Sequence, residues 1–224
     1  VLTFEPHPNM ILEKNGTFKL LNTYEQKYRM LESLGVDYLY LLPFNNALAS
    51  VEPAEFVQRY LLNNFQVGKI FVGFNFTFGN RGKGTARLLR ELGTQNGFDV
   101  WILDPVMAGE QVVSSTAIRE KYLAGDIRGA ASMLGYWPVI EGPVTGGEKR
   151  GRKMGFPTAN IAVAEYVLLP SYGVYAAFAV IEETQQILPA IINIGVKPTF
   201  GSDKPTVEAY ILGYQGDLYA KHMA

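Results

Sequence analysis

The sequence predicts two domains, a parallel sheet covered by helices over residues 1–134 and a small antiparallel β-barrel over residues 135–224. Up to about Gly135, short apolar runs alternate with helical patterns, and this alternation is typical of parallel α/β sheets. Beyond Gly135 the helical periodicity stops, and strand-like runs are separated by Gly and Pro, which is typical of small barrels. The hydrophobic content of 48% in 224 residues is sufficient for a substantial core.

Apolar runs and cap signals mark the individual elements. In the first domain we expect strands at 1–4, 36–44, 69–74 and 98–103, and helices at 23–34, 53–64, 85–95, 115–124 and 127–134. The barrel strands are expected at 136–145, 173–182, 187–194 and 206–213. Thr23 and Gln26 have the spacing of a capping box at the start of the first helix, and Asp126 is the expected cap of the last. Because ligands of parallel sheets bind at the carboxyl ends of the strands, we expect a site there.

The composition excludes several classes of protein. The chain has 20 basic against 21 acidic side chains, which argues against a protein that mainly holds nucleic acid by its backbone. The absence of cysteine excludes disulfides, zinc thiolate sites and thiol nucleophiles, and two histidines, His7 and His222, are too few for a histidine-rich metal site. No apolar run approaches the roughly 20 residues of a membrane span, and no signal peptide opens the chain. We therefore expect a cytoplasmic protein without membrane contact, and the sequence leaves its oligomeric state open, a homo-oligomer included.

The segment GGEKRGRKMGFPTAN (146–160) concentrates four glycines and four cations in one loop. Backbone amides in glycine-rich loops and nearby cations bind phosphate. The candidate phosphate-binding residues are Gly147, Lys149, Gly151, Arg152 and Gly155. The alternative for such a loop, taken alone, is a solvated basic turn.

Thr158 and Asn160 follow this loop and are candidate metal ligands. Pro157 directs Phe156 away from helical geometry, so the segment is expected to be extended. Alternate residues of an extended chain share a face, which brings Thr158 and Asn160 together. A hydroxyl and an amide oxygen are ligands that Mg²⁺ accepts when substrate phosphates provide the negative charge. The alternative is a hydrogen-bonded strand edge.

KRGR and GFPTAN are followed along the chain by GVYA (173–176), NIGVKPTFG (193–201) and VEAYILGYQGDLY (207–219). The order and spacing of these motifs resemble those of riboflavin kinases. The resemblance implies that Thr158 and Asn160 bind Mg²⁺ and ATP, and that Glu208 is the general base for the attacking hydroxyl. A carboxylate is chemically suited to accept that proton, although an isolated strand glutamate is more often simply exposed. Many relatives have His where this chain has Tyr210.

Three further motifs, TFEPHP (3–8), VGFNFTFGNRGKGT (72–85) and VVSSTAIRE (112–120), lie in the first domain. Their order resembles that of the FMN adenylyltransferase that bacteria fuse to this kinase, which implies a nucleotidyltransferase-like (Rossmann-like) sheet. The residues that would then hold nucleotide phosphates are Asn75, Ser115, Thr116 and Arg119. His7 would be a catalytic and binding residue that supports the flavin phosphate or ATP.

The residues themselves leave alternatives open at these positions. Hydroxyls and N–H groups at a helix start suit an anion, and Arg119 shares a helix face with Ser115, but simple capping by Ser114 is equally compatible. A guanidinium there could clamp phosphate with two hydrogen bonds. His7 between two prolines could only stiffen a turn. Many relatives have Asp in place of Asn75.

The sequence departs from its relatives at both ends. An HxGH loop, which in relatives precedes the FxPHP motif, is absent, and so are the strand and long helix that follow the GDLYGK motif. We therefore expect a fragment of a longer chain, and an incomplete adenylyltransferase site within it.

The resemblances imply an enzyme of FAD biosynthesis. The barrel domain is expected to transfer the γ-phosphate of ATP to riboflavin, giving FMN. The sheet domain is expected to transfer AMP from a second ATP to FMN, giving FAD and pyrophosphate. Three alternatives stay open: a monofunctional riboflavin kinase with a non-functional first domain, a non-catalytic regulator that binds flavin or nucleotide, and a barrel that binds nucleic acid.

Overall fold

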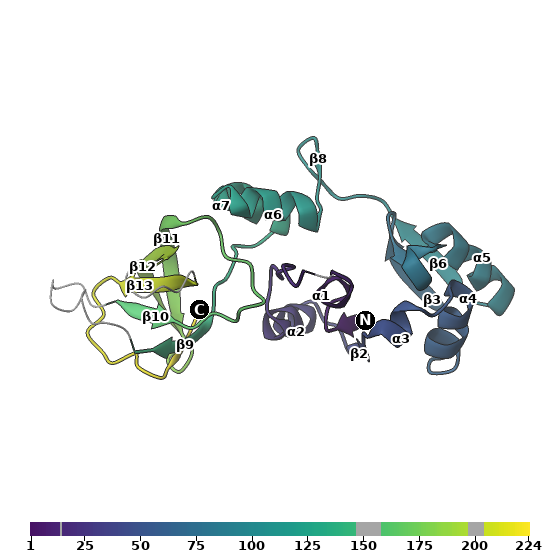
Figure 1. Ribbon diagram of the computed structural model, residues 1–224, viewed down its shortest axis with the longest axis horizontal. Helices are drawn as coiled ribbons and strands as arrows, with labels where there is room; N and C mark the ends of the chain where they lie inside the picture. The colour runs from purple at the N-terminus through teal and green to yellow at the C-terminus, as the bar shows by residue number, and fades with distance from the viewer. Residues whose placement is uncertain (14, 147–157, 197–203) are drawn as a thin grey trace. The chain divides into compact units, whose positions relative to one another are not determined.

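The computed structural model describes residues 1–13, 15–146, 158–196 and 204–224. Its contacts divide the chain into two compact units (Figure 1). Unit 1 consists of residues 1–18 and 28–112, and unit 2 consists of residues 19–27 and 113–224. The contacts therefore group residues 113–134 with the barrel, whereas the sequence pattern divides the chain between residues 134 and 135. That sequence boundary stays a prediction.

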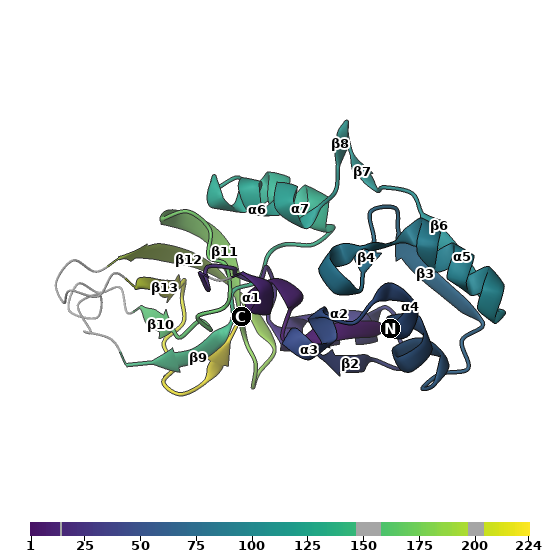
Figure 2. The same ribbon diagram turned by 45° about the vertical axis from the view of Figure 1, so that its right-hand side comes forward.

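Unit 1 contains two pairs of parallel strands among the residues described, and parallel pairing is what the alternation of strands and helices predicts. β1 (Leu2–Glu5) pairs with β2 (Tyr40–Pro43), and β3 (Lys69–Gly73) pairs with β6 (Asp99–Leu103). Figure 2 shows β3 beside β6, with α5 (Ala86–Asn96) packed against β6. The strand expected at 36–44 is shorter than predicted, because only Tyr40–Pro43 pairs with β1.

The remaining elements of unit 1 are short. α1 (Pro8–Leu12) follows β1, α2 (Tyr24–Ser33) begins in unit 2 and ends in unit 1, and α3 (Asn46–Ala49) follows β2. α4 (Pro53–Phe56) continues as a π-helical stretch over Val57–Leu62, and together they account for the predicted helix at 53–64. The hairpins are β4 (Thr77–Phe78) with β5 (Gly84–Thr85), which enclose a 3₁₀ turn at Asn80–Gly82, and β7 (Met107–Ala108) with β8 (Gln111–Val112).

The core of unit 1 gathers apolar side chains from its helices and its strands. Val57 and Leu89 are 1% and 2% exposed and lie in one cluster with Val100 of β6. Gly93 lets α5 approach the chain at the start of β6, since a Cβ at this position would lie 2.6 Å from the carbonyl oxygen of Phe98. α5 ends at Gly97, whose φ of 80° is a conformation that glycine adopts without steric cost.

Unit 2 contains a closed barrel with the strand order β10-β13-β12-β11-β14-β9. The strands are β9 (Gly142–Thr145), β10 (Ala159–Ile161), β11 (Gly173–Ile181), β12 (Gln186–Val196), β13 (Pro205–Ile211) and β14 (His222–Met223). Every pairing is antiparallel, so the predicted barrel is confirmed. The strand expected at 136–145 begins only at Gly142, and β10 and β14 were not predicted because runs of two or three residues show no periodicity.

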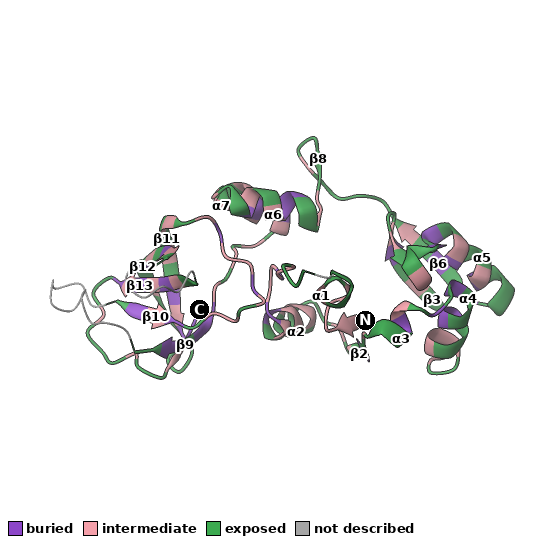
Figure 3. Cartoon of the chain, viewed as in Figure 1, coloured by how far each residue is buried: buried purple, intermediate pink, exposed green. Residues whose placement is uncertain are grey.

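The barrel strands alternate between an inner apolar face and an outer face. On β13, Val207, Ala209 and Ile211 are 2–4% exposed, whereas the residues between them are partly exposed. Ile181 of β11 and Ile194 of β12 are 0% and 2% exposed and belong to the same core. Figure 3 shows buried stretches on the barrel strands β9 and β10. The even-numbered positions of β13, which include Glu208, therefore lie on the outer face.

Residues 19–27 pack within unit 2 although they come from the N-terminal part of the chain. The N–H of Leu20 donates to the carbonyl of Tyr166, and the N–H of Leu168 donates to the carbonyl of Leu20, each at 2.7 Å. These two main-chain hydrogen bonds attach the segment to the loop between β10 and β11.

The capping box at the start of α2 is confirmed. The N–H of Gln26 donates to Thr23 Oγ1 at 3.0 Å, and the N–H of Thr23 donates to Gln26 Oε1 at 2.9 Å. The Thr23 hydroxyl in turn donates to Glu141 Oε1 at 2.7 Å, and all three side chains are buried. The box therefore starts the helix and also satisfies a buried carboxylate that lies just before β9.

α6 (Ser115–Leu123) and α7 (Ile127–Leu134) complete unit 2 and contact each other. Ser114 caps α6 by accepting the N–H of Ala117 at 3.2 Å, and Asp126 caps α7 by accepting the N–H of Gly129 at 2.9 Å, as expected from the sequence. Tyr122 is buried, and this burial raises its pKa to about 12. Across the described ranges, no helix combines the length and the apolar character that crossing a bilayer requires.

We predict that Ile181→Ala lowers the free energy of unfolding of unit 2 by about 2–5 kcal/mol, because it leaves a cavity in the barrel core. The matched control is Ile187→Ala on β12, where the side chain is 67% exposed and the change should stay within about 0.5 kcal/mol. Urea denaturation followed by circular dichroism measures both. Equal destabilisation by the two variants would contradict the assignment of inner and outer faces.

Candidate functional site

Glu208 lies in the middle of a row of polar side chains on the outer face of the barrel. In the register of β13, Glu208 is opposite Asn160 of β10 on one side and opposite Asn193 of β12 on the other. Directly opposed residues of antiparallel strands point to the same face, with Cβ atoms roughly 4.5–5.5 Å apart. The register therefore brings one carboxylate and two amides together from three separate segments of the chain.

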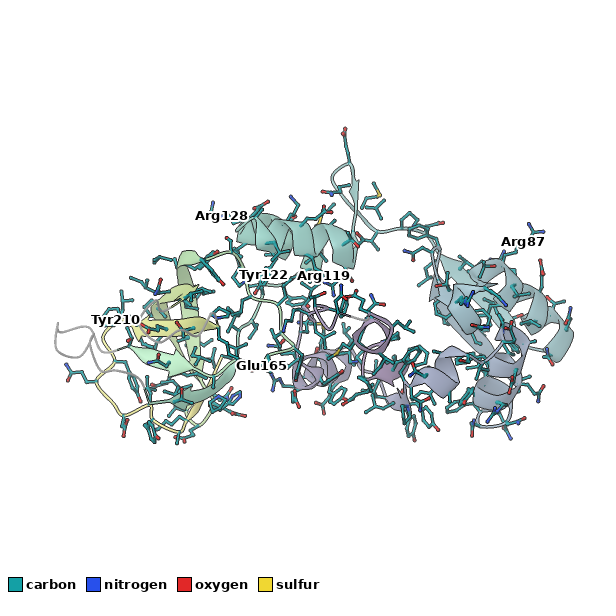
Figure 4. All side chains as sticks on the ribbon, in the orientation of Figure 1. Arg87, Arg119, Tyr122, Arg128, Glu165 and Tyr210 are labelled. Atoms are coloured by element: carbon teal, nitrogen blue, oxygen red, sulfur yellow. The ribbon has the colours of Figure 1, made fainter. Side chains whose placement is uncertain are left out.

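The neighbours of this row are also polar or aromatic. Thr145 of β9 is opposite Asn160, and its hydroxyl donates to the Asn160 carbonyl at 3.4 Å. Tyr210 lies two residues beyond Glu208 on the same face of β13 (Figure 4). Thr158 is exposed and directly precedes β10, two residues before Asn160. The phosphate-binding candidates Gly147, Lys149, Gly151, Arg152 and Gly155 lie outside the described residues.

The donor set of the row fits a magnesium ion that arrives with a nucleotide. In the part of the chain that the structure describes, no group of three or more His, Cys, Asp or Glu side chains could hold a metal ion. Thr158 and Asn160 instead offer neutral oxygens. Mg²⁺ keeps several waters and takes few protein ligands when substrate phosphates complete its coordination, so neutral oxygens are sufficient there.

A pocket of about 710 Å³ opens beside the ends of β10 and β13. Its apolar wall includes Ile161, Leu169 and Val207, and two lysines, Lys19 and Lys204, lie on its lining. Both ammonium groups contact Glu165, Lys19 through the carbonyl and Lys204 through the carboxylate. The Lys204 ammonium holds the pKa of the Glu165 carboxyl below its usual value. Apolar walls with cations beside them suit a ring system that carries an anionic group.

His7 has a local structural role in unit 1. Its Nδ1 accepts the N–H of Asn9 at 3.2 Å and so caps α1, and its ring stacks on Phe18 with 4.8 Å between centroids. These contacts are compatible with the stiffened turn that the sequence offered as an alternative. The predicted contact of His7 with a flavin phosphate or ATP stays a prediction.

The other adenylyltransferase candidates divide between the two units. Asn75 follows β3 in unit 1, whereas Ser115, Thr116 and Arg119 lie at the start of α6 in unit 2. The Arg119 guanidinium donates to the carbonyls of Ser115 at 3.3 Å and Lys19 at 3.2 Å (Figure 4). These bonds hold the guanidinium beside the first turn of α6, while capping by Ser114 is present as well.

Asn193 was not among the residues that the sequence singled out, although it stands at the start of the motif NIGVKPTFG. Asn193 is identified by the register of β12 on β13, and the pattern of residues within one strand does not reveal this register. The structure thus adds one amide to the predicted set of Asn160 and Glu208.

Comparison with known proteins places two family models along the chain. Residues 1–117 match the model described as FAD synthetase, and residues 134–224 match the model described as riboflavin kinase. Curated proteins named bifunctional riboflavin kinase/FMN adenylyltransferase match over almost the whole chain. Those of Listeria monocytogenes, Bacillus subtilis and Escherichia coli K12 are 36%, 34% and 32% identical. These alignments cover 99%, 98% and 100% of this chain, and 70%, 69% and 71% of the relatives.

A solved structure from Streptococcus pneumoniae has the same fold. It is 32% identical, with a TM-score of 0.87, and the match covers 100% of this chain and 72% of that one. Its title names a macrolide-efflux protein, whereas both family models and the three relatives above name flavin enzymes.

Proposed function

We propose residue assignments for two reactions, from the premise that this chain belongs to the family of bifunctional riboflavin kinases/FMN adenylyltransferases. The function of the family is FAD biosynthesis, and both of its domains are present here. The kinase converts riboflavin and ATP into FMN and ADP. The adenylyltransferase converts FMN and a second ATP into FAD and pyrophosphate. Riboflavin, FMN, FAD and ATP are therefore the substrates and products of this enzyme.

For the kinase, Glu208 is the general base. Its carboxylate accepts the proton of the riboflavin 5′-hydroxyl while the hydroxyl oxygen bonds to the γ-phosphorus and the bond to the β-phosphate oxygen breaks. The observation that carries this assignment is the register that sets Glu208 directly opposite Asn160, with both residues partly exposed on the outer face of the barrel. A base must lie within hydrogen-bond reach of the hydroxyl while the phosphate is held beside it.

Thr158 and Asn160 hold the ATP side of this site through Mg²⁺. The ion, when bound, neutralises charge on the phosphates and keeps the transferring group in place. The two side chains contribute a hydroxyl and an amide oxygen at the edge of β10, next to the base. Gly147, Lys149, Gly151, Arg152 and Gly155 would supply the amides and cations that surround the phosphates.

For the adenylyltransferase, the proposed phosphate-binding residues are Asn75, Ser115, Thr116 and Arg119, and His7 supports the flavin phosphate or ATP. Hydroxyls and N–H groups at the start of a nine-residue helix, with a guanidinium held beside its first turn, support this assignment. Both reactions depend on positioning and charge neutralisation, and no covalent nucleophile is needed. We place both reactions in the cytoplasm, where their substrate ATP is abundant.

We predict that this protein, incubated with riboflavin, ATP and Mg²⁺, forms FMN that chromatography detects. FAD in addition shows that the adenylyltransferase acts as well. FMN without FAD supports the alternative of a monofunctional kinase with a non-functional first domain. If neither product forms, the enzyme assignment is contradicted and a regulator that only binds flavin or nucleotide is favoured.

We predict that Glu208→Gln lowers the rate of FMN formation by roughly 10²–10⁴-fold, because the amide cannot accept the hydroxyl proton. Binding of riboflavin and ATP, measured by fluorescence and calorimetry, should change little. The matched control is Glu182→Gln, at an exposed glutamate that directly follows β11, which should leave turnover within about twofold. Unchanged turnover in Glu208→Gln would rule out the assigned base.

A further inference from the structure

Asn193 of β12 lies opposite Glu208 of β13 in the strand register. Asn160 lies opposite Glu208 on the other side, on β10. Asn193 is exposed on the outer face of β12, next to the buried Ile194. The sequence motifs assign no role to this position. Its place in the row makes it the neighbour of the base on the side away from the Mg²⁺–ATP ligands.

An asparagine in this strand needs a physical reason. β12 spans Gln186–Val196, and the chain around this position is Ile191, Ile192, Asn193 and Ile194. Branched apolar residues favour strands, whereas Asn is depleted in them because its amide competes for backbone hydrogen bonds. Among the described residues, the structure gives the Asn193 side chain no hydrogen bond, so it stabilises neither the strand nor a turn. Such local inconsistencies are expected at functional sites.

The geometry suits an amide that serves the base. Cβ atoms of opposed residues lie roughly 4.5–5.5 Å apart, a distance that an asparagine amide and a glutamate carboxylate bridge in common rotamers. The amide offers two N–H donors, and an ionised carboxylate only accepts. A hydrogen bond to a charged acceptor is stronger than one between neutral groups.

We propose that Asn193 is a positioning residue of the kinase reaction. With substrates bound, its amide donates to one oxygen of the Glu208 carboxylate and holds the other oxygen toward the riboflavin 5′-hydroxyl. Asn193 transfers no proton; its hydrogen bond restricts the side-chain torsions of the partly exposed Glu208 and so favours the reactive geometry. This inference rests on the proposed role of Glu208 as the base.

The test compares three substitutions of Asn193 with one control in the whole chain. Asn193→Ala removes the donor, Asn193→Asp keeps the shape without the N–H groups, and Asn193→Ser restores a shorter donor. The control is Gln186→Ala, which removes an exposed amide from the start of the same strand. Steady-state FMN formation gives kcat, and the KM for riboflavin and for ATP, for each variant.

We expect kcat to fall roughly tenfold in Asn193→Ala and Asn193→Asp and to recover partly in Asn193→Ser, with each KM within about twofold of the unsubstituted protein. Gln186→Ala should match the unsubstituted protein. A rise of the riboflavin KM at constant kcat would overturn the proposal, since it would show that Asn193 only binds substrate. Unchanged kinetics in all three variants would overturn it too.

A double substitution separates action through Glu208 from an independent effect. In the Glu208→Gln background, where the carboxylate is gone, Asn193→Ala should lower the residual turnover by less than about twofold. A full tenfold loss there would contradict a role that acts through Glu208. If the unsubstituted protein forms FMN normally, any of these negative results contradicts the role of Asn193 and leaves the proposed function intact. If it forms none, the proposed function fails together with this inference.

Discussion

The register of β13 between β10 and β12 is the constraint on which the rest of unit 2 depends. It directs Val207, Ala209 and Ile211 into the core, and by the same alternation it turns Glu208 outward between two amides. A slip of one residue would place the carboxylate in the core and Val207 in water, which costs both burial and charge solvation. The same strand register therefore determines which apolar side chains are buried and where the Glu208 carboxylate lies. The buried apolar face of β13 thereby holds Glu208, the proposed base, on the outer face of the barrel.

The part of the chain that forms unit 2 is wider than the riboflavin kinase family model. That model begins at residue 134, yet residues 19–27 and helices α6 and α7 fall in the same compact unit as the barrel. The capping box of Thr23 and Gln26 satisfies the carboxylate of Glu141, which directly precedes β9. Removing residues 19–27 would take the Thr23 hydroxyl away from this buried carboxylate. The loss would lower the free energy of unfolding of unit 2, because a buried charged group that loses a hydrogen-bond donor is destabilised. Expression of residues 134–224 alone would thus remove part of the support of the kinase barrel.

Much of the fold follows from local patterns in the sequence. Local sequence patterns predicted the capping box and the caps Ser114 and Asp126, because each involves residues that are close in sequence. The strands β11 and β12 were predicted because they are long apolar runs. β10 and β14 were missed because pairing across the barrel, rather than periodicity, defines strands of two or three residues. For the site, motif order identified Asn160 and Glu208, whereas Asn193 became visible only through the register. His7 was singled out by the motif TFEPHP and by its place after the first strand, and in the structure it caps α1 and stacks on Phe18.

The kinase assignments all require that riboflavin is phosphorylated on the outer face of the barrel, at Glu208. The most direct test is a crystal structure of this protein with Mg²⁺, ADP and riboflavin bound. We expect a Glu208 carboxylate oxygen within about 3.2 Å of the riboflavin 5′-oxygen, with Asn160 on the nucleotide side and Asn193 on the other. A flavin whose 5′-hydroxyl lies beyond the reach of Glu208, with the nucleotide phosphates away from β10, would contradict it.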